Sequence, residues 1–233
     1  PLGRRAVAKL NDLGVVIDVS QMSSQALTQV TQLSHAPVIA SHTGVQGMMD
    51  IRRNLSDADL AHIKATGGLV NIVAYSKYLK PFSRETIARM NALRERYGLP
   101  DVQNQTQMGT TTDPVFSIWP EKKFGEFLTP FYDILGQEPE ATLAEYVDSI
   151  DYAVKKIGID HVGISSDFND GGGVIGYQNV GESRNVTAEL IQRGYSDEDI
   201  AKLWGGNFLR VWDTVQRAAK PANTPVTQLQ GYP

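Results

Sequence analysis

Short apolar runs alternate with longer stretches of helical spacing along most of this chain. Four runs are rich in β-branched residues and end in polar ones, and we expect strands at residues 15–20, 37–42, 69–75 and 161–168. Elsewhere apolar residues recur every three or four positions, which predicts helices. The expected helices cover residues 4–13, 24–33, 56–66, 83–97 and 142–157, and a last helical segment opens at residue 196 and continues through 207–215.

Three of these helices begin with a capping box, in which a hydroxyl residue is followed three positions later by an acidic one. The pairs are Ser56 with Asp59, Thr142 with Glu145, and Ser196 with Asp199. The caps fix where the helices start.

Strand and helix alternate four times, which predicts an α/β domain with a parallel sheet over residues 1–218. Four such units make half of an eight-stranded (βα)8 barrel, and they also suit a small doubly wound sheet. Periodicity alone does not separate the two. Residues 219–233 are rich in Pro, Thr and Gln, and we expect an extended tail there.

An insertion of about residues 76–138 interrupts the alternation. Residues 101–113 are polar and predict a loop, whereas residues 116–135 are dense in aromatic side chains, including Trp119 and Phe127. A connection of this length is uncommon unless it is functional. We expect the aromatic segment to pack onto a neighbour, as an active-site lid or as the contact of a homodimer.

Composition narrows the classes of function. The 233 residues are 41% hydrophobic and carry a net charge of −4, and the basic residues do not cluster, which argues against a nucleic-acid partner. No apolar run approaches the roughly 20 residues that span a bilayer. The chain opens at Pro1, with neither an initiating Met nor a signal-peptide pattern, so we expect it to be processed or trimmed, and both an exported and a cytoplasmic location stay open.

Polar residues follow each expected strand, at the edge where parallel α/β folds place their sites. His42 ends the second strand and suits a metal ligand or a base. Alternatively, it is a structural histidine at the edge of the core, hydrogen-bonded to a carbonyl group. Asp167 ends the fourth strand and suits a ligand, a base or an amine-binding group, or alternatively a helix cap. Arg53 suits a bidentate contact with a carboxylate, or alternatively a solvated charge. We expect structural roles for His35, His62 and His161.

Several stretches, in order and spacing, resemble the membrane (renal-type) dipeptidases, a family of zinc peptidases. The stretches are residues 13–20 (LGVVIDVS), 36–42 (APVIASH), 52–57 (RRNLSD), 163–168 (GISSDF), 185–190 (NVTAEL) and 204–207 (WGGN). The resemblance implies a TIM-barrel metallohydrolase fold of the (βα)8 type, of which this chain supplies about the last four βα units plus the insertion. It also implies one or two zinc ions and a small peptide as substrate.

The resemblance further implies a role for each site residue. His42 would bind metal, Arg53 would hold the substrate's terminal carboxylate, and Tyr78 would line the substrate pocket. Asp167 would bind the substrate's amine and take part in catalysis, while the metal activates the attacking water.

Two departures from the family pattern bear on activity. Gln21 stands where the family has a second zinc-binding His, and an amide oxygen is a poor zinc ligand. The His-x-Asp pair and bridging Glu of the family's early strands are absent from this sequence. We therefore expect that an N-terminal half of the barrel is missing, either because this is a piece of a longer chain or because the protein is a natural half barrel.

Three functions compete at this point. The first is a zinc-dependent hydrolase of dipeptides or similar small amides. The second, suggested by Gln21, is a metal-poor homologue that binds or tailors a modified peptide, such as a siderophore precursor in the periplasm. The third is a structural role in which the aromatic insertion forms a subunit contact.

Overall fold

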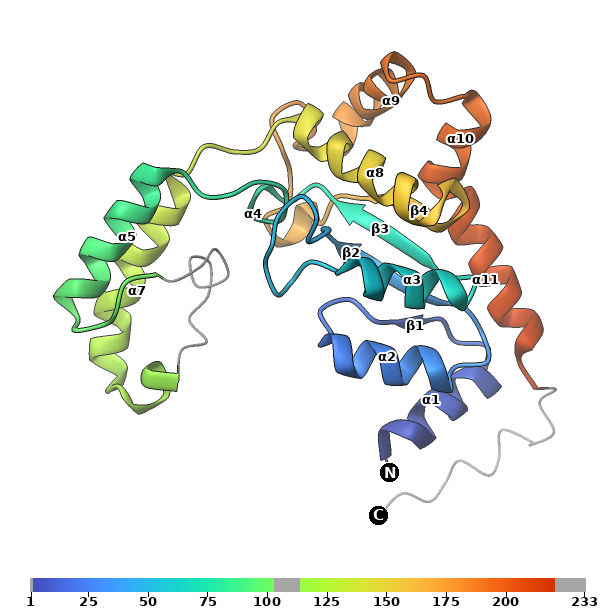
Figure 1. Cartoon of the computed structure of the whole chain (residues 1–233), viewed down its shortest axis with the longest axis horizontal. Coiled ribbons are helices and arrows are strands. Elements are labelled where there is room, and N and C mark those ends of the chain that lie inside the picture. The colour runs from blue at the N-terminus through green and yellow to red at the C-terminus, as the bar shows by residue number, and fades with distance from the viewer. Residues whose placement is uncertain (1, 103–113, 221–233) are drawn as a thin grey trace.

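The computed structural model describes residues 2–102 and 114–220, and these form a parallel four-stranded sheet (Figure 1). The strands are β1 (Ile17–Asp18), β2 (Val38–Thr43), β3 (Leu69–Val73) and β4 (Val162–Ser165), and they lie side by side in the order β1-β2-β3-β4. A doubly wound sheet would reverse its strand order at a switch point, whereas a (βα)8 barrel keeps sequential order. The α/β class and the parallel sheet are therefore confirmed, with the strand order of a barrel.

Three helices cover one face of the sheet (Figure 1). These are α2 (Ser24–Leu33), α3 (Asp57–Ala65) and α8 (Leu143–Ile157), with α3 packed between the other two. Their fully buried side chains, including Leu27, Leu60 and Ile150, form one apolar core with Val38 and Val70 of the strands. Such burial supplies most of the driving force that holds helices on a sheet.

The opposite face of β2 and β3 packs against α11 (Asn207–Ala218), through Val211 and Val215. Arg210 ties this helix to the start of the sheet, because its guanidinium donates to the carbonyl oxygens of Gly67 at 2.9 Å and Asp160 at 2.6 Å. The remaining helices beside the sheet are α1 (Leu2–Asp12), α9 (Ser183–Gln192) and α10 (Asp197–Ala201), with a π-helical turn at Lys202–Gly206.

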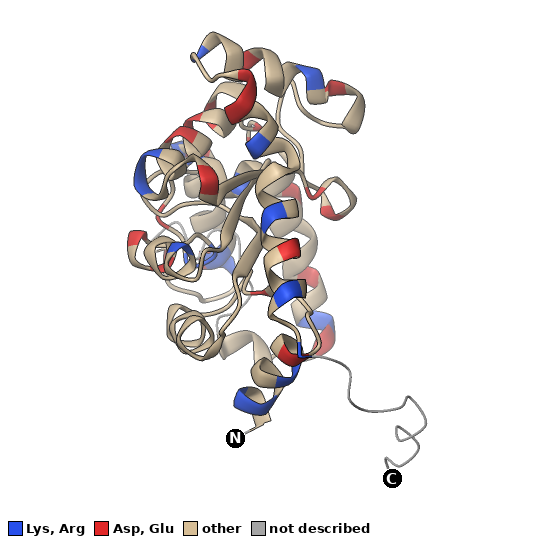
Figure 2. Ribbon diagram, turned by 90° about the vertical axis from the view of Figure 1, so that its right-hand side faces the viewer, with Lys and Arg blue, Asp and Glu red and all other residues tan. Residues whose placement is uncertain are grey.

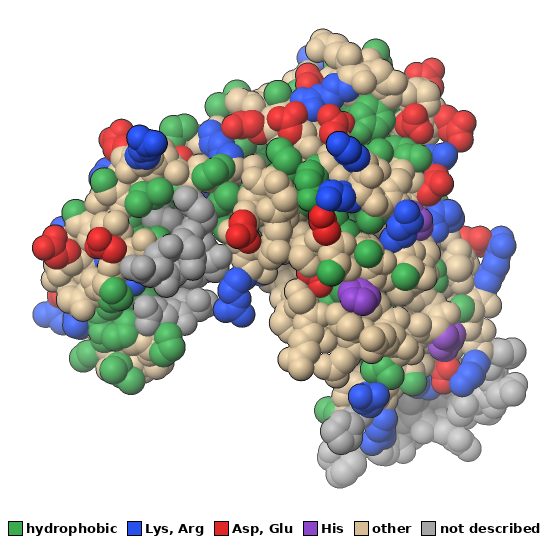
Figure 3. Space-filling view, in the orientation of Figure 1, with side chains coloured by type: hydrophobic (Ala, Val, Ile, Leu, Met, Phe, Trp, Pro, Cys, Tyr) green, Lys and Arg blue, Asp and Glu red, His purple; other side chains and the backbone are tan. Residues whose placement is uncertain are grey.

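Between β3 and α8 the chain forms the elements α4 (Ser76–Leu79), α5 (Arg84–Arg96), η1 (Pro114–Ile118) and α7 (Glu121–Gly136). Helices α5 and α7 pack against each other as a helical pair, which stands to one side of the domain (Figures 1 and 3). Phe127 is fully buried here, with its ring 5.3 Å from that of Tyr97 and 5.6 Å from that of Trp119. Many of the aromatic side chains thus pack against one another inside the pair. The homodimer contact stays a prediction, and a buried Phe127 does not offer it a surface.

The structure refines several expected boundaries. All three capping boxes form. The strand expected at 15–20 pairs only over Ile17–Asp18, and the one expected at 161–168 ends at Ser165 because a left-handed turn follows. Most of the expected loop at 101–113 and most of the tail at 219–233 lie outside the described residues.

Charged residues of both signs are interspersed over the ribbon (Figure 2). Within residues 2–102 and 114–220, we find no helix with the length and apolar character needed to cross a bilayer.

Candidate active site

The candidate residues come from the segments that leave the carboxyl ends of the strands. Gln21 follows β1, His42 is the second-last residue of β2, and Asp167 follows β4. Tyr78 lies in α4, directly after β3, and Arg53 lies in the loop between β2 and α3. Because parallel strands end at one edge of a sheet, these side chains are brought to the same edge.

A chain of hydrogen bonds fixes the imidazole of His42. Ser41 Oγ donates to Asp18 Oδ2 at 2.6 Å, so this hydroxyl accepts the N–H of His42 Nδ1, at 2.8 Å. The proton on Nδ1 leaves the lone pair of the ring on Nε2. A ring oriented in this way, with one nitrogen bonded to protein and the other free of a proton, is the arrangement of metal-binding histidines.

Asp18 anchors this chain because β1 and β2 are in register. Its carboxylate also accepts from the backbone N–H of Ser20 at 2.9 Å, from the hydroxyl of Ser20 at 2.7 Å and from the backbone N–H of Ser41 at 3.1 Å. Partial burial raises the pKa of Asp18, but the hydrogen bonds from Ser41 and Ser20 outweigh it and hold the pKa below the ordinary 3.8. The group is therefore an anion at neutral pH.

Gln21 lies directly against this ring. Its Nε2 is 2.8 Å from Nε2 of His42, and since the lone pair of His42 is there, the amide donates the hydrogen bond. Gln21 also adopts a left-handed backbone with φ 63, which is uncommon for a residue other than glycine. The amide thus occupies the coordination position that the imidazole would offer.

Asn54 positions the loop that carries Arg53. Its buried side-chain Nδ2 donates to the carbonyl oxygens of Met49 and Tyr78, both at 2.8 Å, which ties the loop to α4. Gly44 leaves the room for this contact, because a Cβ there would collide with Asn54 Oδ1 and lie 2.8 Å from the carbonyl oxygen of Tyr78. The loop that carries Arg53 is held beside the segment of Tyr78 for this reason.

Two tyrosines, Tyr75 and Tyr78, feel the fields of both candidate charges. The rings of Tyr75 and Tyr78 are 4.9 Å apart. Burial raises the pKa of Tyr78; the field of Arg53 opposes the rise and that of Asp167 adds to it. Burial also raises the pKa of Tyr75, with Asp170 and Asp167 adding to the rise. Both phenols are therefore protonated donors at neutral pH, within electrostatic reach of Arg53 and Asp167.

Asp167 takes a left-handed conformation, with φ 56 and ψ 34, at the turn after β4. Its carbonyl oxygen accepts from the backbone N–H groups of Asp170 at 3.0 Å and Gly172 at 2.9 Å, which closes the turn. Within the described residues its half-buried carboxylate makes no hydrogen bond and caps no helix. Its side chain is available to a ligand.

The described residues supply one strong metal ligand at this edge. No group of three His, Cys, Asp or Glu side chains among them could hold a metal ion. The histidines visible on one face lie apart (Figure 3), and His161 Nδ1 lies 2.8 Å from the carbonyl oxygen of Gly68, as its structural interpretation predicts. His42 is suited to bind a metal, whereas the amide of Gln21 is a poor zinc ligand.

Comparison with known proteins finds similar dipeptidases. The probable dipeptidase PvdM from Pseudomonas aeruginosa is 57% identical with a TM-score of 0.93, over 94% of this chain and 55% of that one. Dipeptidase tcpJ from Claviceps purpurea is 27% identical over 94% of this chain and 39% of its own length. A metallo peptidase from Rhodobacter sphaeroides, solved with a phosphinate mimic of the dipeptide L-Ala-D-Ala, is 22% identical with a TM-score of 0.61, over 91% of this chain and 46% of that one, and shows the same fold.

The chain thus spans about half, or less, of the length of these relatives. The profile of the membrane dipeptidase family, peptidase family M19, matches residues 1–226, nearly the whole sequence. This chain belongs to the membrane dipeptidase family.

Proposed function

We propose that this chain forms the substrate-binding part of a metal-dependent dipeptidase, a hydrolase of dipeptides or similar small amides, and that the metal is zinc. The observation that carries the proposal is the pair of opposite charges, Arg53 and Asp167, which both act electrostatically on the protonated phenol of Tyr78. A free dipeptide carries a carboxylate at one end and an ammonium group at the other. The site offers a partner of opposite sign for each end.

Each residue has a defined task in this proposal. Arg53 binds the terminal carboxylate through its planar fork of donors. Asp167 binds the free amine and is the catalytic residue that carries a proton near the reacting bond. Tyr78 donates a hydrogen bond to the substrate, because burial keeps its phenol protonated.

His42 would be one metal ligand, held by Ser41 and Asp18 in the tautomer that presents Nε2. The bound zinc would polarise the scissile carbonyl group and supply a water with a pKa of about 7. The remaining ligands and half of the barrel would come from residues outside those described. Export to the periplasm is part of the same proposal.

One observation favours a second function, in which a metal-poor homologue binds or tailors a modified peptide such as a siderophore precursor. The amide of Gln21 donates to the atom of His42 that a metal would need. Loss of one nitrogen ligand weakens a zinc site strongly. The two functions differ in their metal content, which makes them separable by experiment.

The deciding test measures zinc per chain in the full-length protein, purified without chelator, together with cleavage of neutral dipeptides. The dipeptidase predicts bound zinc, cleavage that a chelator abolishes, and a raised KM in Arg53→Met but not in Arg5→Met, an exposed arginine of α1. A protein without zinc and without cleavage would overturn the first function. In that case Gln21→His should raise the zinc content, and an unchanged zinc content would show that this ligand position does not set the function.

A further inference from the structure

A pocket of about 180 Å³ adjoins the candidate site, lined by α4, the loop after β4 and the segment after α7. Its walls include Tyr75, Lys77, Lys80, Glu138, Glu140 and Gly171. A cavity needs only about 10–15 Å³ to hold one water, so this pocket has room for a side chain of a ligand. Tyr75 belongs to the pocket wall and its ring also contacts that of Tyr78.

Hydrogen bonds hold the three segments around the pocket together. The backbone N–H of Gly173 donates to the carbonyl oxygen of Ala74 at 2.6 Å, and the backbone N–H of Ala141 donates to Ser76 Oγ at 3.0 Å. Ser76 Oγ is also 3.4 Å from the carbonyl oxygen of Gly173. The pocket is therefore formed before any ligand enters, which lowers the entropy cost of binding.

Lys77 brings to this pocket an ammonium group that forms no ion pair with the described residues. Its side chain is half-buried, and its ammonium group has no hydrogen bond or ion pair with any residue in 2–102 or 114–220. Burial lowers the pKa of Lys77. Lys80, its neighbour in the wall, is different: its Nζ donates to the carbonyl oxygen of Glu140 at 3.0 Å and lies 4.0 Å from Oε1 of Glu145.

The two acidic residues of the wall are occupied by other partners. Glu138 accepts from the backbone N–H of Ser83 at 3.0 Å and from its hydroxyl at 2.9 Å. Glu140 accepts from Nε2 of Gln178 at 2.7 Å. Neither carboxylate forms a hydrogen bond with Lys77, so among the described residues this ammonium group has no acceptor.

We propose that this pocket binds a carboxylate of the ligand, held by the ammonium group of Lys77. A partly desolvated cation without a counter-ion is unfavourable, and an entering carboxylate supplies the missing acceptor. The position beside Tyr75 and Tyr78 suits a peptide whose ends contact Arg53 and Asp167 and whose acidic side chain reaches past Tyr75. This substrate preference rests on the proposed peptidase function, whereas the carboxylate site itself does not.

Competitive acetylation of the full-length protein tests the site directly. Acetic anhydride modifies the free amine of each lysine, and mass spectrometry of peptides reads each rate with glutarate, with neutral glutaramide or with neither. We expect glutarate to slow acetylation of Lys77 about tenfold, because a rise of one pKa unit reduces the free-amine fraction tenfold. Glutaramide should have no such effect, and Lys155, exposed at the end of α8, should keep its rate. An unchanged rate at Lys77, equal protection by glutaramide, or equal slowing at Lys155 would overturn the proposal.

A second measurement separates the substrate preference from the peptidase function. Lys77→Met should lower kcat/KM for a dipeptide with a glutamate side chain and leave that for a dipeptide with a glutamine side chain unchanged, while Lys155→Met changes neither. Equal losses for both dipeptides, or no loss, would refute the preference. If the protein cleaves no dipeptide, the peptidase function fails while protection of Lys77 by glutarate still establishes the carboxylate site.

Discussion

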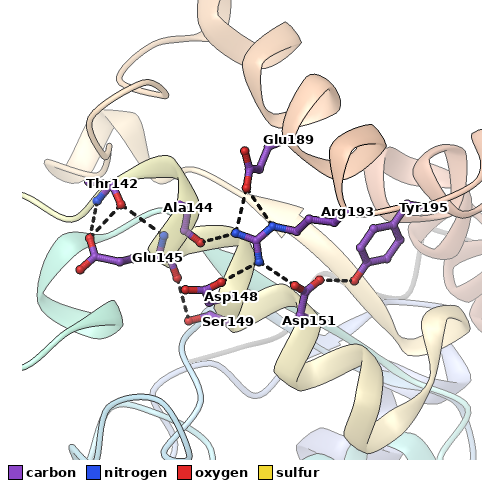
Figure 4. A network of polar contacts seen from close by, with 9 residues as sticks. All are labelled: Thr142, Ala144, Glu145, Asp148, Ser149, Asp151, Glu189, Arg193 and Tyr195. Atoms are coloured by element: carbon purple, nitrogen blue, oxygen red, sulfur yellow. Dashed lines mark hydrogen bonds and ion pairs between the residues drawn. The ribbon is translucent and has the colours of Figure 1, made fainter.

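Arg193 offers the clearest quantitative test of how the helices beside the site are held (Figure 4). Its guanidinium lies 2.6 Å from Asp148, 2.6 Å from Asp151 and 2.8 Å from Glu189, and it donates to the carbonyl oxygen of Ala144 at 3.0 Å. It therefore joins α9 to α8, the helix that covers β3 and β4. Despite partial desolvation, these carboxylates raise the pKa of Arg193, which is charged at every accessible pH.

Arg193→Met removes the charge and keeps much of the aliphatic length. Hydrogen bonds to charged groups are worth about 1.5–3 kcal/mol each, but those sharing one side chain do not add. The carboxylates retain 48%, 38% and 22% exposure, so solvent screens the repulsion left among them. We expect a loss of about 2–3 kcal/mol in the free energy of unfolding, or about 4–12 °C in Tm.

Urea unfolding of the full-length protein at neutral pH measures this loss. Arg217→Met is the matched control, because the Arg217–Asp213 pair is exposed at 80% and 55% and should contribute about 0–0.5 kcal/mol. Asp151→Asn should destabilise the wild type more than the Arg193→Met background, because both lose strength in the hydrogen bond from Tyr195 but only the wild type also loses the ion pair with Arg193. An Arg193→Met variant within 0.5 kcal/mol of its control, or an equal effect of Asp151→Asn in both backgrounds, would show that the network contributes no net coupling.

Two further predictions concern the site. The folded-state pKa of Asp18 lies below 3.8, so the stabilisation by its carboxylate is present above that pH and is lost as the pH falls through the folded pKa. The difference in free energy of unfolding between wild type and Asp18→Asn should therefore shrink on acidification below pH 3.8. A constant difference between pH 6 and 2 in urea titrations would contradict this. Gly44→Ala should lower the free energy of unfolding, measured in urea, by about 1–3 kcal/mol, because the new methyl group meets Asn54 and the backbone of Tyr78. Gly125→Ala in α7, where the space around the Cβ is open, should leave the free energy of unfolding unchanged or raise it. Equal effects of the two alanines would refute the steric account.

Structural features that depend on residues close together in the chain could be predicted from the sequence. Each capping box needs only residues three positions apart, and all three predicted boxes form. Position at a strand end is also local, which is why His42 and Asp167 could be singled out before the structure. Their assigned roles stay predictions, because the structure shows where they lie and not what they bind.

Contacts that depend on register or on distant segments gave no such signal. The bond from Ser41 to Asp18 exists because Ile17 pairs with Val38 and Asp18 with Ile39, and no pattern in either strand states that register. Asn54 looks like an ordinary loop residue until Tyr78 is placed beside it. Likewise, the aromatic residues near Phe127 indicated a packing surface, but only the structure shows that their partner is α5 in the same chain.

The backbone itself marks two of the candidate site residues. Among the described residues, Gln21 (φ 63) and Asp167 (φ 56) are the non-glycine residues with positive φ. This conformation costs roughly 1–2 kcal/mol for an L-residue, less for Asp, whereas glycine adopts it freely. Glycine would stabilise either turn, so the side chains of Gln21 and Asp167 each lower the free energy of unfolding relative to glycine. Such strain commonly occurs at functional sites, where the direction of a side chain matters more than its contribution to folding. A His at position 21 would carry the same backbone cost, so the conformation marks Gln21 as a candidate site residue while its role beside His42 stays a prediction.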